Sequence, residues 1–227
     1  MDLINNDIKE YEDKDMCAKC GGMCCKNSGC NYLPKDFDNM NFEYLKGRLE
    51  GKEISIASTF NFFCNNKKEV ISANPILHLR VRNIGKGIVD LFSKKTSCSV
   101  LTETGCPYTL DKRPSGGVYL VPKTTGCINI YSEKQQIEDW TRHQKVLQKL
   151  VKYYANCSVD EQIKREVINT TAEMYIELKS LNGNVNKASQ EIKNILITLN
   201  YLSNLYKKEI QEGQEKGEAE YKKMILK

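Results

Sequence analysis

The chain has 227 residues, 28% of them charged, and a formal net charge of +5. This length suits one domain of ordinary size, or a core domain with an appendage. Lys and Arg are interleaved with Asp and Glu along most of the chain, which argues against a nucleic-acid-binding surface. No apolar run approaches the roughly 20 residues of a membrane-spanning helix, so we expect a soluble protein without membrane contact.

Cysteine is the most informative residue type, because five of the ten cysteines fall within fourteen residues. They are Cys17, Cys20, Cys24, Cys25 and Cys30. Two thiolates separated by two residues can chelate one ion from a tight turn, and Gly21 and Gly22 permit the positive φ angles of such a knuckle. Because the donors are thiolates, the pattern predicts zinc, or else an iron–sulfur cluster, over calcium or magnesium.

The segment between the N-terminal cysteines and Ser132 is expected to be irregular and rich in loops, since Gly, Pro and Cys interrupt it repeatedly. A helix is predicted over about residues 36–50, ended by Gly51. Branched and aromatic residues predict short strands at 54–57, 76–81 and 118–121. The strand at 76–81 would place His78 and Arg80 on one face.

A second set of cysteines lies far downstream, and each of its members is close to Gly, Pro or Thr turn signals. These are Cys98, Cys106 and Cys127. If the two distant sets close on one site, they fix the fold of this part of the chain. Cys64 and Cys157 lack ligand spacing, and we interpret them as packing or surface thiols.

Disulfides are the alternative use of an even number of cysteines. The first ten residues have neither a basic segment nor an apolar segment, so we expect no export and a cytoplasmic location. A reducing cytosol disfavours stable bridges, and metal binding is therefore the favoured interpretation. A redox-active cysteine pair is the residual alternative.

Proline is absent after Ser132, and apolar residues recur at intervals of three and four. Three helical stretches are predicted, over about 133–155, from 160 to the Asn182-Gly183 break, and over 185–210. Beyond them the chain becomes rich in Gln, Glu, Lys and Gly. We favour a bundle helix with a frayed, solvated end over a protruding helix that pairs with a second copy or another protein.

These elements predict an α+β protein in two parts. A loop-rich, metal-stabilised domain with a few short strands covers residues 1–132, and a helical bundle or helical extension covers residues 133–227. With these residues in view, the chain resembles the YkgJ-like cysteine-cluster family, whose members are described as zinc- or iron-chelating proteins. The resemblance rests on Cys17-x2-Cys20-Gly21-x2-Cys24-Cys25, on Cys98 through Cys106, and on Arg113-Pro114, and it covers roughly residues 15–131.

The resemblance implies six metal ligands, at Cys17, Cys20, Cys24, Cys25, Cys98 and Cys106. The family pattern usually has another cysteine shortly after Arg-Pro, whereas this chain has Gly117. Cys30 and Cys127 are the natural substitutes and bring the inventory to eight thiols, enough for two four-cysteine sites or for one site with spares. Their negative charge needs nearby cations, for which Lys19, Lys26, Arg80, Arg82 and Arg113 are candidates.

Two functions remain open from the sequence. The first is a metal-binding or accessory module that contacts a protein or peptide partner, with a homodimer through the C-terminal helix as one form. The second is a metalloenzyme that modifies a protein or peptide with an iron–sulfur cluster or an open metal site. A similar cluster that ends in a Cys-Cys pair occurs in flagellin lysine methylases, which keeps this alternative in view. His78 and His143 lie in no catalytic motif, and the sequence favours the first function.

Overall fold

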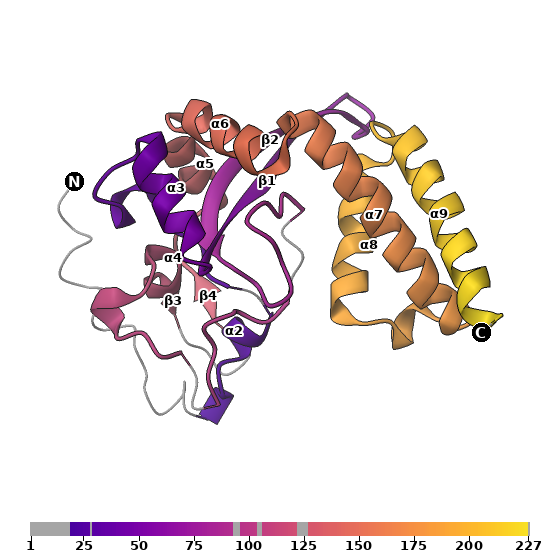
Figure 1. Ribbon diagram of the computed structural model, residues 1–227, viewed down its shortest axis with the longest axis horizontal. Coiled ribbons are helices and arrows are strands. Elements are labelled where there is room, and N and C mark those ends of the chain that lie inside the picture. The colour runs from indigo at the N-terminus through magenta and orange to yellow at the C-terminus, as the bar shows by residue number, and fades with distance from the viewer. Residues whose placement is uncertain (1–18, 28, 93–95, 104–105, 122–126, 227) are drawn as a thin grey trace. The chain divides into compact units, whose positions relative to one another are not determined.

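The computed structural model describes residues 19–27, 29–92, 96–103, 106–121 and 127–226 (Figure 1). The described part is a mixed α+β structure with two small antiparallel two-stranded sheets and a helical C-terminal region. Its helices and strands are α2 (Met23–Asn27), α3 (Phe42–Glu50), β1 (Ile54–Cys64), β2 (Val70–Val81), α4 (Ser115–Val118), β3 (Leu120–Val121), β4 (Ile128–Asn129), α5 (Glu133–Thr141), α6 (Gln144–Ala155), α7 (Val159–Ser180), α8 (Gln190–Leu202) and α9 (Lys207–Ile225). In this part of the chain, no helix is both long and apolar enough to cross a membrane.

The chain forms two compact units that differ from the predicted division at Ser132. The first unit combines Met1–Ala57, Ile76–Asp90 and Lys95–Leu150, and the second combines Ser58–Pro75, Leu91–Lys94 and Val151–Lys227. The β1–β2 hairpin therefore contributes its base to the first unit and its tip to the second. Helix α5 and the first half of α6 group with the cysteine-bearing segments and not with the C-terminal helices.

Trp140 explains why α5 belongs to the first unit. Its indole ring is fully buried, and Nε1 donates a hydrogen bond of 3.2 Å to the carbonyl oxygen of Tyr32. The ring also packs edge-on against Phe37, with 6.4 Å between centroids. Four residues later, the Gln144 side chain forms two hydrogen bonds with the backbone of Leu77 in β2. Its amide oxygen accepts the Leu77 N–H at 2.9 Å, and its amide nitrogen donates to the Leu77 carbonyl oxygen at 2.8 Å. Burial of the only tryptophan thus ties α5 and α6 to the N-terminal half.

The strands at 54–57 and 76–81 are confirmed, although β1 and β2 each extend further toward the hairpin tip. The strand at 118–121 is wrong in its first half, because Val118 ends α4 and only Leu120 and Val121 pair, with Asn129 and Ile128. The helix expected at 36–50 begins only at Phe42, since Asn41 caps it by accepting the Tyr44 N–H at 2.9 Å.

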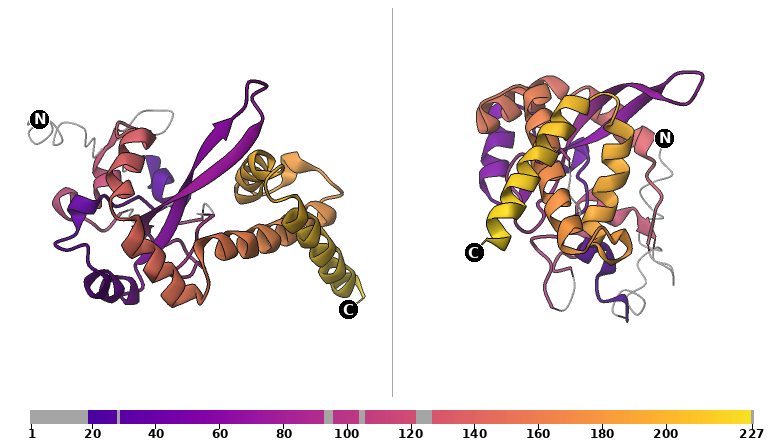
Figure 2. Two further views of the ribbon diagram at one scale, coloured as in Figure 1. Left: turned by 90° about the horizontal axis from the view of Figure 1, so that it is seen from above. Right: turned by 90° about the vertical axis from the view of Figure 1, so that its right-hand side faces the viewer.

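The second unit contains a pair of closely packed helices, α7 and α9, with α8 beside α7 (Figure 2). Helix α7 begins with a capping box in which Ser158 and Glu161 exchange hydrogen bonds. A methyl group at Gly213 would lie 2.6 Å from the Ile168 carbonyl oxygen, and one at Gly217 would lie 2.8 Å from the Ala172 carbonyl oxygen. The two glycines, one helical turn apart, therefore let the backbones of α7 and α9 approach closely.

This packing corrects the expectation of a frayed C-terminal end. The polar segment after Ile210 continues as α9 to Ile225, and Gly213 and Gly217 are buried within it. The pattern of large apolar residues misses this contact, because glycines make it. The stretch at 133–155 is also two helices and not one, with a break at residues 142–143 between α5 and α6.

Candidate metal centre

The N-terminal cysteine segment forms the expected glycine turn. Gly21 and Gly22 have φ angles of +60° and +74°, which favour glycine. After this turn the Met23 N–H donates to the Cys20 sulfur at 3.3 Å, and α2 begins. Helix α2 carries Cys24 and Cys25. Cys17, the first predicted ligand, lies outside the described residues.

Backbone hydrogen bonds join this segment to the distant second cysteine set. The Cys98 N–H donates to the Cys25 carbonyl oxygen at 2.7 Å, and the Ser97 hydroxyl donates to the Lys26 carbonyl oxygen at 3.1 Å. Cys98 also forms a β-bridge with Asn83, just after β2. Cys98 is 2% exposed. The end of β2 thus holds the two cysteine segments side by side, 73 positions apart in the chain.

Four thiols meet here, and we call Cys24, Cys25, Cys98 and Cys106 the thiol cluster. Cys25 is at its centre, because hydrogen bonds with Cys106, Cys24 and Cys98 all raise the pKa of its thiol. The Cys24 and Cys25 sulfurs are 4.0 Å apart. The hydrogen bond with Cys25 lowers the pKa of each of the others, to about 6 at Cys24 and Cys106 and about 7 at Cys98. Cys25 therefore keeps its proton and shares it through hydrogen bonds with three neighbouring sulfurs, which lose their own protons more readily.

Two arginines accompany the thiol cluster. Arg113 hydrogen-bonds to Cys106 and lowers the pKa of that thiol further by its positive charge. Arg80 is 3% exposed, and its charge lowers the pKa of Cys98. The Arg80 guanidinium also donates to the Gly29 carbonyl oxygen at 3.0 Å and to the Asn83 side chain at 3.2 Å. Both arginines therefore have the charge-balancing position that the sequence predicts for them.

Arg82, another predicted counter-charge, has a different environment. Its guanidinium donates to the carbonyl oxygens of Leu49 at 3.0 Å and Ile54 at 2.6 Å. These contacts link the end of α3 to the start of β1. Arg82 therefore holds backbone in place beside the cluster.

Cys30 is held between β2 and α4 by close backbone contacts. Its carbonyl oxygen accepts the Val81 N–H at 2.9 Å, and the next residue, Asn31, accepts the Gly116 N–H at 2.9 Å. A methyl group at Gly29 would lie 2.3 Å from the Val81 carbonyl oxygen, and one at Gly116 would lie 2.4 Å from the Asn31 carbonyl oxygen. Burial raises the pKa of the Cys30 thiol to about 12. The close backbone contacts at these two glycines fix the place of Cys30.

Gly117, where the family pattern suggests a cysteine nearby, lies against Cys30. A methyl group at Gly117 would be 3.2 Å from the Cys30 sulfur and 3.0 Å from the Arg113 side chain. The negative charges of Cys98 and Cys106 also contribute to the raised pKa of Cys30. Cys30 therefore lies next to the thiol cluster and is in contact with Gly117. Its role as a substitute ligand stays a prediction.

The other cysteines have different surroundings. Cys127 is half-buried and directly precedes β4, and its role as a ligand also stays a prediction. Cys64 is exposed at the end of β1, and Cys157 is buried with its sulfur 3.6 Å from a side-chain oxygen of Gln162. As their side chains stand, no three His, Cys, Asp or Glu residues in the described part form a group that could hold a metal ion. The four thiols are hydrogen-bonded neighbours, and their sulfurs do not surround one common centre.

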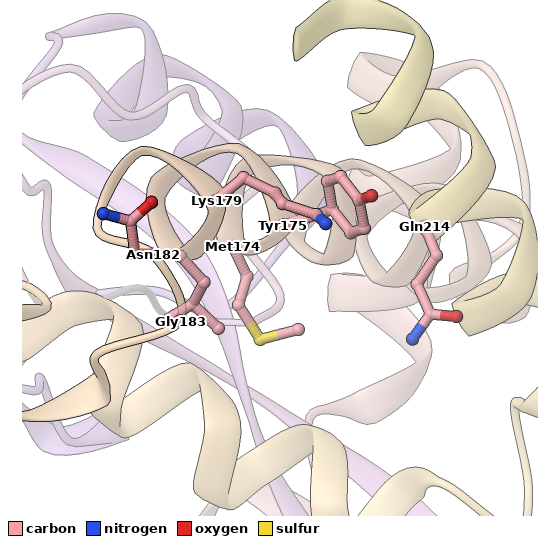
Figure 3. Close-up of a pocket in the computed structure, with 7 residues that line it drawn as sticks. Met174, Tyr175, Lys179, Asn182, Gly183 and Gln214 are labelled. Carbon is pink, nitrogen blue, oxygen red and sulfur yellow. The ribbon is translucent and has the colours of Figure 1, made fainter.

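The second unit contains a hollow of about 560 Å³ (Figure 3). It is lined by Met174, Tyr175, Leu178, Lys179, Asn182, Gly183 and Gln214. The Lys179 ammonium lies 5.5 Å from the centroid of the Tyr175 ring. The lining contains no cysteine, so this hollow takes no part in the cysteine chemistry.

Comparisons with known proteins identify no relative. No protein-family model matches the chain, and neither a curated protein nor a solved structure does. The resemblance to the YkgJ-like family therefore stays an inference from the cysteine pattern, and the functional argument rests on the site itself.

Proposed function

We propose that this protein binds zinc, or alternatively an iron–sulfur cluster, through the thiol cluster, and that it acts as a binding or accessory module. The observation that carries the proposal is the meeting of Cys24, Cys25, Cys98 and Cys106 around the Cys25 thiol. Unpaired thiols are rarely concentrated in this way in a chain without a redox or metal role. Two of the four thiols come from α2, and the other two, Cys98 and Cys106, come from a part of the chain more than 70 positions further on.

The donor set fits such a group. Zinc–sulfur bonds of about 2.3 Å in a tetrahedral site place neighbouring sulfurs about 3.8 Å apart. The Cys24 and Cys25 sulfurs, at 4.0 Å, already have nearly this separation. Metal binding requires deprotonated thiolates, and the lowered pKa values of Cys24, Cys98 and Cys106 favour them near neutral pH. Arg80 and Arg113 would offset part of the resulting negative charge.

Binding would also require a rearrangement of the thiols. The proton held by Cys25 must leave, and the four sulfurs must turn toward one centre, since no ready-made metal-holding group exists in the described part. Cys20 and Cys30 lie close to Cys24 and Cys25 in the sequence, and they are the nearest further thiols that could bind the metal. A closed shell of four thiolates would leave no open position for a substrate and would make the metal structural.

A structural metal is consistent with a module that acts by binding a partner. The first unit has short secondary-structure elements and would present its loops in a fixed form once the cluster is closed. In the second unit, Ile197 and Tyr201 of α8 lie one helical turn apart and are 59% and 52% exposed. Exposed apolar side chains of this kind suit contact with a protein or peptide.

The test is metal analysis with an absorption spectrum, on the full chain purified without oxygen. We expect zinc and no visible absorption band. Iron with sulfide and a broad visible band would identify a cluster and would make a modifying metalloenzyme the better function. Protein that holds neither metal, and that takes up neither on reconstitution, would contradict the proposal.

A further inference from the structure

A backbone hydrogen bond holds Cys98 next to Cys25, so the two thiols are close enough to react with each other. We propose that Cys25 and Cys98 form an oxidative modification site, at which a peroxide converts the two thiols into a disulfide. This inference rests on the thiol cluster of the proposed function and concerns how that site is regulated. It does not require the metal to be zinc.

The backbone geometry singles out this pair. The Cys98 N–H donates a hydrogen bond of 2.7 Å to the Cys25 carbonyl oxygen, so the two backbones are in direct contact. The thiols of the same two residues are also hydrogen-bonded to each other. A disulfide needs two backbones that lie close together in this way. Cys24 is a poorer partner, because it is the residue next to Cys25 in α2 and consecutive Cα atoms are only about 3.8 Å apart.

Cys106 is the competing partner, and its surroundings oppose it. The Cys106 sulfur is hydrogen-bonded to the Arg113 side chain. The Arg113 guanidinium also donates a hydrogen bond of 3.2 Å to the Tyr108 carbonyl oxygen. No backbone hydrogen bond between Cys106 and Cys25 is found among the described residues. Closure of a Cys25–Cys106 bridge would have to break the Arg113 contact.

The reaction divides between the two cysteines according to their exposure. Cys25 is half-buried and Cys98 is 2% exposed, so a small peroxide reaches Cys25 first. Cys25 first passes its proton to one of the sulfurs hydrogen-bonded to it and then attacks hydrogen peroxide as a thiolate. The product is a sulfenic acid, and the hydroxide that is released takes up the proton and leaves as water. The Cys98 sulfur then attacks the sulfenic sulfur, the S–O bond breaks, and a second water leaves with the Cys98 proton. Two thiols are oxidised, one peroxide is reduced, and the products are one disulfide and two waters.

The consequence is a metal site that oxidation can open. A Cys25–Cys98 bridge removes the central thiol of the cluster and the most buried of its partners. Two thiols of the cluster would remain, which is too few for a closed shell. Oxidation is therefore expected to release the bound metal, and reduction of the bridge to restore the site.

The experiment treats the full-length protein, as purified, with one equivalent of hydrogen peroxide, and then alkylates and digests it with trypsin under non-reducing conditions. Cleavage at lysine gives peptides 20–26 and 96–112, which contain the four cluster thiols. We expect these peptides to be linked to each other in the treated sample and separate in the untreated one. The link should persist in Cys24→Ser and Cys106→Ser and vanish in Cys25→Ser and Cys98→Ser. Cys64→Ser, whose cysteine is exposed and lies in the second unit, is the control that should keep it.

Other outcomes overturn the inference. The first is a link between the two peptides that is lost in Cys106→Ser and kept in Cys98→Ser. The second is a link that joins either peptide only to the peptide containing Cys30. The third is that all cluster thiols are still alkylated after peroxide treatment, so that no disulfide has formed. Trp140 emission, read on every variant, shows whether the first unit has folded. Metal is measured on each sample before peroxide is added, so the two proposals can fail separately. Bound metal without the link rejects only the redox site, whereas the link without any metal rejects only the proposed function.

Discussion

The two units of this protein are stabilised in different ways. In the second unit, α7 and α9 pack with their backbones in close approach at Gly213 and Gly217, and Ser158 and Ser189 cap the N-termini of α7 and α8. The first unit has shorter elements and depends on long-range links, such as Trp140 to Tyr32 and Cys98 to Cys25. Its four clustered thiols are a poor source of stability unless a metal joins them. We therefore expect metal to matter for one unit and not for the other.

Removal of metal with a chelator should have the largest effect that differs between the two units. Removal of metal should unfold the cysteine-bearing unit, because structural zinc contributes about 10 kcal/mol or more in small thiolate domains. Trp140, now fully buried, should shift its emission to the red, while the circular dichroism of α7, α8 and α9 largely persists. Limited proteolysis should cut first in the segments of the first unit and later in α7, α8 and α9. Equal loss of both units, or of neither, would break the comparison.

Gly213→Ala should act on the second unit alone. The added methyl group would lie 2.6 Å from the Ile168 carbonyl oxygen and from Cβ of Thr171, so α9 has to move away from α7. Overpacking of this kind costs about 1–3 kcal/mol. The measurement is thermal unfolding followed by helical circular dichroism, with Trp140 emission as the report on the first unit.

Gly47→Ala is the matched control for this substitution. Gly47 lies in α3 with nothing within 4 Å of an added methyl group. The same exchange should therefore stabilise the protein, by up to about 1 kcal/mol, through helix propensity. Stabilisation by Gly213→Ala would mean that the two helices do not approach as described.

His78 should make the first unit sensitive to acid. Burial lowers the pKa of its imidazole from 6.5 to about 3, and the charge of Arg80 acts in the same direction. The unfolded chain takes up a proton below pH 6.5 while the folded chain does not, so stability is present above pH 6.5 and falls toward pH 3. Between pH 7 and pH 5 the loss should reach about 2 kcal/mol.

The measurement is the urea midpoint of Trp140 emission at the two pH values. His78→Gln should flatten the pH dependence, whatever its effect on stability at pH 7. His143→Gln is the control, because His143 is only half-buried and should contribute less. An unchanged slope in His78→Gln would show that other groups cause the acid sensitivity.

The sequence predicted the features that follow from local chemistry. The glycine turn after Cys20, the strands of the hairpin base and the helical character of the C-terminal region all depend on nearby residues. The meeting of the N-terminal cysteines with Cys98 and Cys106 was expected from their residue type, and the structure brings four of the eight predicted ligands together. Whether they bind metal stays a prediction.

The features that the sequence missed depend on contacts between distant segments. Helix α9 looked like a solvated end because glycines make its packing surface, and no apolar pattern marks them. The place of α5 is set by Trp140 and its contact with Tyr32, which lie 108 positions apart. Gly29 and Gly116 permit backbone contacts around Cys30 that only the folded chain shows.

The most direct test of the central claim is the metal content of two single variants, Cys98→Ser and Cys157→Ser. Both cysteines are buried, but Cys98 belongs to the thiol cluster and Cys157 lies in the second unit. Each protein is purified without oxygen, checked for folding by Trp140 emission and helical circular dichroism, and analysed for zinc and iron. We expect Cys157→Ser to retain the metal of the original chain and Cys98→Ser to lose at least one ion per chain. Equal metal content in both variants would contradict the assignment of the metal to the thiol cluster.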